Sequence, residues 1–212
     1  MQEPINPNEP ITSRISDQLY LLSSDLKQSF GWFERVEPIP KEVESSIARG
    51  TYTGTVPIRL KLVRRRKLPP VAWVPGYYPV VTAAIVQELT QSQVTGWIGY
   101  PVVVEGATVE MEPRFALGIT GRCASIKAES HSANFEIRTD HGFPALYSKL
   151  LVDLDSWDGS DLFMGEDAVS LFNCATKKAV DVFSIIKHLG IRFRPLSDVW
   201  FLEGPAPELD GL

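Results

Sequence analysis

The sequence predicts an α+β fold: a single domain in which a mixed or antiparallel sheet carries two main helices. Short runs rich in apolar and β-branched residues recur along the chain and are separated by proline and glycine, which is typical of strands. Two longer apolar stretches, at residues 79–89 and 176–189, are predicted as helices. With 212 residues, of which 44% are apolar and 22% charged, the chain is long enough to bury a sizeable core.

Strands are predicted where apolar or β-branched residues cluster or alternate. In the run at residues 51–63, Ile58, Leu60 and Leu62 alternate with polar residues, which indicates one buried face. Residues 24–47 are predicted as a loop with a short helix. The predicted strands are residues 17–23, 51–63, 97–105, 115–126 and 191–196, with shorter candidates at 150–154, 162–163 and 169–172.

The two helices differ in how clearly the sequence marks them. The first is predicted to begin near Pro79, since proline is tolerated in the first turn, and to continue to Leu89. The second has Thr176 as a plausible N-cap and Gly190 as a C-cap residue. Its apolar residues form one continuous stripe: Ala179, Val182, Phe183, Ile186 and Leu189.

Each predicted helix is followed by the same short pattern of glycine, four residues, proline and an aliphatic residue. The pattern runs from Gly96 to Pro101 in the first case and from Gly190 to Pro195 in the second. Helix-to-strand connections commonly look like this, so chance is one explanation. The other is two related helix–strand units packed on a shared sheet.

The ends of the chain are expected to lie outside the domain. Residues 1–15 contain three prolines and few large apolar groups, so we expect a flexible arm. Residues 16–202 form the predicted domain, and residues 203–212 an acidic tail. There is no secretory signal and no run of roughly 20 apolar residues, so a cytoplasmic protein without a membrane partner is expected.

The net charge of −5 comes from the last third of the chain. Residues 144–212 carry 11 acidic and 6 basic side chains, whereas residues 1–143 carry 15 of each. An acidic region argues against nucleic-acid binding and suits a basic protein partner, although an ordinary solvated surface also explains it. The basic run at residues 64–67 is short and is predicted to be a solvated strand end or loop.

The residue types that usually carry catalysis are few and scattered. His131, His141 and His188 lie in none of the known metal-ligand spacings, and no serine nucleophile motif is present. Cys123 and Cys174 lie far apart and outside any C-x-x-C motif, which predicts reduced, partly buried thiols rather than a disulfide or a catalytic thiol.

Four aspartates lie close together at residues 153–161, which raises the question of a calcium loop. Counted from Asp153, the EF-hand positions 5, 6 and 12 hold Trp157, Asp158 and Met164, none of which fits. An irregular calcium site is the weaker alternative. The aspartates and serine are better explained as side chains that hydrogen-bond to the backbone of a tight turn, with Gly159 at positive φ.

That segment also carries a resemblance to a known family. The sequence W-D-G-S-D-L-F at residues 157–163, the helix from Thr176 and the segment 190–195 resemble bacterial immunity proteins of polymorphic-toxin systems. These proteins share a W-x-G-S-D element before a C-terminal helix, and residues 96–102 resemble their middle segment. A related subset carries paired C-x-x-C-G elements, which this chain lacks, so neither zinc nor another cofactor is implied.

The resemblance implies a non-enzymatic protein that binds and neutralises a cognate toxin. The acidic C-terminal third of the chain would suit a basic one. Acidic side chains and a few aromatic anchors would form the contact surface. The alternatives are a small hydrolase or metal-dependent enzyme with a site assembled from scattered residues, and a structural or adaptor module of a phage or secretion system. The candidate partner-binding residues are Asp155, Asp158, Asp161, Glu166, Asp167, Tyr77 and Tyr78.

Overall fold

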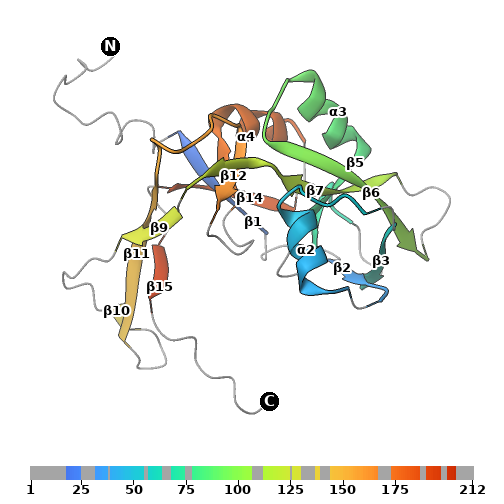
Figure 1. Ribbon diagram of the computed structural model, residues 1–212, viewed down its shortest axis with the longest axis horizontal. Coiled ribbons are helices and arrows are strands. Elements are labelled where there is room, and N and C mark those ends of the chain that lie inside the picture. The colour runs from blue at the N-terminus through green and yellow to red at the C-terminus, as the bar shows by residue number, and fades with distance from the viewer. Residues whose placement is uncertain are drawn as a thin grey trace.

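The structure is a computed structural model. In the part of the chain that it describes, strands are more frequent than helices (Figure 1). Three helices of eight or nine residues accompany fifteen strands there, so the fold is mainly β. The predicted α+β class, with two main helices on one sheet, is therefore wrong. The described residues are 18–24, 32–37, 39–54, 57–63, 68–74, 78–106, 112–124, 126–129, 137–138, 144–166, 173–186, 190–196 and 200–203.

Both predicted helices are shorter in the structure. Tyr78–Thr82, which includes the predicted start of the first helix, is strand β5, and helix α3 spans Ala83–Gln91. The run Val80, Val81 and Thr82 explains the error, because β-branched side chains favour a strand and all five residues of β5 are buried. Helix α4 spans Lys177–Ser184, and residues 187–189 lie outside the described part.

A six-stranded sheet nearly closes on itself. Its strand order is β2-β3-β6-β7-β5-β4, and the two end strands, β2 and β4, lie in contact. Only the β3–β6 pair is parallel. Helix α2 (Lys41–Ala48) packs against β7. The remaining strands of this sheet are β2 (Trp32–Arg35), β3 (Ile58–Val63), β4 (Val71–Val74), β6 (Trp97–Glu105) and β7 (Arg114–Ile119).

A second sheet has five strands in the order β14-β1-β13-β12-β8. Its neighbours are antiparallel except for the parallel pair of β12 and β8. The chain reaches this sheet both at its beginning and near its end. The strands are β1 (Leu19–Ser24), β8 (Gly121–Cys123), β12 (Leu162–Gly165), β13 (Asn173–Thr176) and β14 (Ile191–Pro195).

A smaller sheet projects from the rest of the molecule (Figure 1). Strand β11 is its centre and pairs with β9, β10 and β15, all antiparallel. The bounds are β9 (Ile126–Glu129), β10 (Ile137–Arg138), β11 (Pro144–Val152) and β15 (Trp200–Glu203). None of the described helices is long and apolar enough to cross a membrane.

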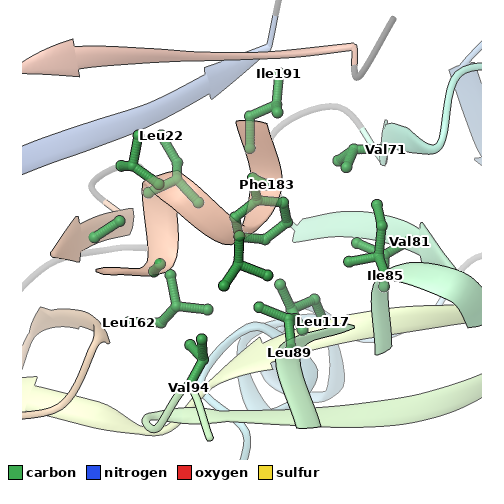
Figure 2. Close-up of a cluster of buried hydrophobic side chains, with 14 of the residues drawn as sticks. Leu22, Val71, Val81, Ile85, Leu89, Val94, Leu117, Leu162, Phe183 and Ile191 are labelled. Atoms are coloured by element: carbon green, nitrogen blue, oxygen red, sulfur yellow. The ribbon is translucent and has the colours of Figure 1, made fainter. Parts of the chain in front are cut away.

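The largest hydrophobic core lies where helices α3 and α4 meet between the two larger sheets (Figure 2). Phe183 of α4 lies at its centre, with Ile85 and Leu89 of α3 opposite. Strands of both sheets contribute Leu117, Leu162 and other apolar side chains to the same cluster. The two sheets therefore share one core, and burial of apolar side chains there is the main force that holds them together.

Candidate functional site

The segment 157–163 forms a corner between β11 and β12. One carboxylate oxygen of Asp158 accepts a hydrogen bond from the backbone N–H of Ser160 (2.9 Å), and the other accepts one from the backbone N–H of Arg122 (2.8 Å). Gly159, which lies between Asp158 and Ser160, has a φ of +80°, a value that residues with a side chain rarely adopt. The predicted tight turn, held by side-chain-to-backbone bonds, is confirmed.

Trp157 anchors this corner to the second sheet. Its ring packs on Phe163 at a centroid distance of 5.1 Å, and its indole N–H donates to the backbone oxygen of Ser160 (3.2 Å). Phe163 is fully buried in a small cluster that also contains Cys123 and Cys174. Trp157 of the motif therefore stabilises the fold by packing and by a hydrogen bond.

Asp161 ties three segments together. Its carboxylate accepts hydrogen bonds from the backbone N–H of Thr95 (2.9 Å), the Thr176 hydroxyl (2.9 Å) and the Lys178 ammonium (3.0 Å). The Asp161 backbone N–H in turn donates to the Thr95 hydroxyl (3.0 Å). Thr95 precedes β6, whereas Thr176 and Lys178 begin α4, so one carboxylate joins the first half of the chain to the second.

Hydrogen bonding outweighs burial in setting the acidity of both aspartates. Burial alone would raise the pKa of Asp161, but the bonds from Thr95, Lys178 and Thr176 lower it further than burial raises it. The pKa of Asp158 is lowered in the same way, against burial, by its bonds from Ser160 and Arg122. Both carboxylates are therefore charged in the folded protein at neutral pH, and both accept hydrogen bonds from other parts of the protein.

Arg122 completes the corner from the side of β8. Its guanidinium donates to the backbone oxygens of Ile119 (2.6 Å), Gly121 (2.8 Å) and Arg49 (2.5 Å). Burial lowers the pKa of Arg122, and the nearby charge of Arg49 lowers it further, while Asp158 and Glu166 act in the opposite direction. Sequence reasoning missed this arginine because the bond that joins it to another part of the fold goes to Arg49, 73 residues away in the chain.

Other carboxylates at this corner face outward. Asp153, Asp155 and Glu166 are exposed. Within the described part of the chain, the carboxylates of Asp153 and Asp155 have neither a hydrogen-bond donor nor an ion-pair partner. The corner thus presents acidic groups that the fold does not use, beside Asp158, which is exposed but already bonded.

The remaining candidate residues are divided between the interior and the undescribed segments. Tyr78 is 1% exposed and Asp161 8%, so both are corrected from surface candidates to interior residues. Tyr78 bonds to Arg35, which also pairs with the buried Glu44. The other sequence candidates outside the described residues are Tyr77, Asp167, His131, His141, His188 and residues 64–67.

Three further aromatic residues pack within or against the cores. Trp73 and Trp97 lie against the main core, and the indole N–H of Trp97 donates to the Val94 oxygen (2.8 Å). Tyr100 packs edge-on against Tyr52, with ring centroids 5.6 Å apart. These rings are therefore packing residues rather than an exposed aromatic patch.

Cys123 and Cys174 are reduced, as predicted, and both thiols are buried in the second sheet. Burial raises the pKa of the Cys174 thiol far above its ordinary value, and the neighbouring Cys123 raises it further. The Cys174 thiol is therefore not activated as a nucleophile. Within the described residues, no three His, Cys, Asp or Glu side chains gather closely enough to hold a metal ion.

Comparison with known proteins assigns no family to the chain: no protein-family model matches it, and no curated protein matches it significantly.

Proposed function

We propose that the protein is an immunity protein that binds a cognate toxin and neutralises it without catalysis. The proposal rests on the W-x-G-S-D resemblance and on one feature of the connection between β11 and β12, which includes the corner at residues 157–163. Two of its exposed carboxylates, Asp153 and Asp155, have no internal partner in the described chain. Charges that the fold does not use are available to steer and hold a basic partner.

The corner also supplies rigidity. Asp158, Trp157 and Arg122 fix its backbone through hydrogen bonds and ring packing. A preorganised loop loses little conformational entropy when a partner binds, so more of the interaction energy appears as affinity. In this proposal the motif residues build the platform, and Asp153, Asp155 and Glu166 contact the toxin.

The test is a binding titration against the toxin encoded beside this gene. The wild-type protein should bind it and abolish its activity. The double charge reversal Asp153→Lys and Asp155→Lys should weaken binding by at least roughly tenfold, mainly through slower association, and the association rate should depend less on salt. Circular dichroism and the urea midpoint should remain those of the wild type, because neither carboxylate has a hydrogen-bond or ion-pair partner among the residues that the structure describes.

The single charge reversal Glu42→Lys changes the net charge as much as Asp153→Lys or Asp155→Lys does alone, so it is the matched control for each of these two single variants. Glu42 is an exposed residue in the first turn of α2, at the opposite end of that helix from Arg49. This variant should bind as the wild type does. Failure of the wild-type protein to bind the toxin would contradict the proposed function. If the double variant binds as tightly as Glu42→Lys, the acidic residues are not the contact surface.

A further inference from the structure

Two four-stranded parts of the molecule have the same strand order and the same helical connection. In the first sheet the order is β4-β5-β7-β6, and helix α3 leads from β5 to β6. In the second sheet the order is β12-β13-β1-β14, and helix α4 leads from β13 to β14. In both, the third strand in the order, β7 or β1, runs antiparallel to both of its neighbours.

The residue pairing matches as well. Thr82, the last residue of β5, lies opposite Arg114, the first of β7. Correspondingly, Thr176, the last residue of β13, lies opposite Leu19, the first of β1. On the other side of the inserted strand, Trp97 to Pro101 pair with Ile119 to Phe115, and Ile191 to Pro195 pair with Ser24 to Tyr20. The pairs just named therefore occupy the same register in the two sheets.

The connections agree in conformation. Thr82 and Thr176 both stand at the N-cap of the following helix, with φ −76° in each case and ψ of 161° and 164°. Each of these threonines also donates its backbone N–H across the sheet, to Pro70 (3.0 Å) and to Asp161 (2.8 Å) respectively, one residue before β4 and β12 begin.

The glycines of the two connections correspond too. Gly96 and Gly190 have φ values of +82° and +81°. A Cβ on Gly96 would overlap the backbone oxygen of Leu162, the first residue of β12, and a Cβ on Gly190 would overlap that of Val71, the first residue of β4. Each unit therefore packs its glycine against the same position of the opposite unit, as a twofold relation requires.

Chain order shows that the inserted strands have changed places. From the N-terminus, the order β1, β4, β5, α3, β6 is repeated as β7, β12, β13, α4, β14. Yet β1 lies between β13 and β14, and β7 lies between β5 and β6. We infer that the chain is a structural tandem duplication whose halves have exchanged their first strands, so that each half forms a slot for an extended strand of the other.

The exchanged strands fit these slots by hydrophobic burial and by backbone pairing. β1 contributes Leu19, Leu21 and Leu22, each at most 7% exposed, to the interior of the second half. β7 contributes Ala116, Leu117 and Ile119, each at most 1% exposed, to the first half. Both strands are hydrogen-bonded on both edges. The partner that each slot fits is an apolar, antiparallel strand from the other half.

Cleavage of the folded full-length protein tests this interlocking. A protease site inserted directly after Gly106 divides the halves at a position with φ +71° and open space around it. After cleavage, the two fragments should co-elute as one 1:1 complex and separate only in denaturant. Separation of the fragments in native buffer would overturn the inference.

A pair of cysteine variants tests the exchange itself. Ser23 lies opposite Arg192 in β14, whereas an unexchanged β1 would take the place of β7 and set Ser23 opposite Ile98. Facing residues of antiparallel strands have Cα atoms within disulfide range. Ser23→Cys with Arg192→Cys should therefore oxidise and join the cleaved halves on a non-reducing denaturing gel. Ser23 and Ile98 both lie in the first half, so the variant Ser23→Cys with Ile98→Cys is followed by thiol titration in denaturant, and both introduced thiols should remain reduced. The reverse result would contradict the exchange.

Discussion

Aspartates only a few positions apart have opposite roles at the corner between β11 and β12. The Asp161 carboxylate accepts hydrogen bonds from Thr95, Thr176 and Lys178, and these bonds hold two halves of the molecule together. Asp155 is exposed and contacts no donor among the described residues. A run of carboxylates in a sequence therefore says little about function until the donors around each one are known.

This difference predicts a pH dependence that Asp161→Asn should reduce. The folded-state pKa of Asp161 is lowered, so its contribution to stability is present above the unfolded pKa of about 3.9 and is lost as the pH falls through the folded value. At pH 7 the variant should lose about 1–3 kcal/mol of unfolding free energy, and the gap to the wild type should narrow below about pH 4. Urea unfolding between pH 7 and pH 2.5 measures it.

Asp155→Asn is the matched control for that series. Its unfolding free energy should stay within about 0.5 kcal/mol of the wild type at each pH, since the side chain is exposed and unpaired in the described chain. A gap between Asp161→Asn and the wild type that stays constant down to pH 2.5 would contradict the electrostatic role of Asp161.

Elements with a strong local signal could be predicted from the sequence. β6 has the predicted bounds, and β3 and β14 lie inside predicted strands. The bounds of β1 differ from the prediction by one or two residues. Thr176 caps α4 as expected. The corner was predicted because aspartate, glycine and serine act locally. β5 was missed because an apolar run buried on both faces has no period that distinguishes strand from helix. The three-sheet arrangement was missed because it depends on pairing between distant segments.

The glycines at the element boundaries give a second prediction. Gly159→Ala should cost only the strain of a left-handed backbone, about 1–2 kcal/mol, since a Cβ there meets nothing within 4 Å. Gly96→Ala and Gly190→Ala carry the same strain and also push a methyl group into a backbone oxygen, which adds about 1–3 kcal/mol. Urea midpoints of the three variants would rank them. Equal losses for all three would contradict the close packing between the halves.

At the scale of the whole molecule, exchange of β1 and β7 makes each sheet depend on both halves of the chain. The core around Phe183 reinforces this dependence, because it collects side chains from β7 and α3 as well as from β12 and α4 (Figure 2). A protein built this way has no half that keeps its sheet complete when the other unfolds. The glycine–proline pattern in the sequence reflects this architecture, but it could not reveal which strand completes which sheet.

The last prediction is that the two halves unfold together. Phe183→Ala removes a ring that is 1% exposed and should cost about 3–5 kcal/mol. Hydrogen exchange should then weaken by the same free energy in β5 and β6 of the first sheet as in β13 and β14 of the second, because unfolding of either sheet releases a strand that the other half supplies. Ile185→Ala, at a 70% exposed residue just after the same helix, should leave both sheets protected. Loss of protection confined to β13 and β14 would show that the halves unfold independently, and the exchanged strands would then not couple them.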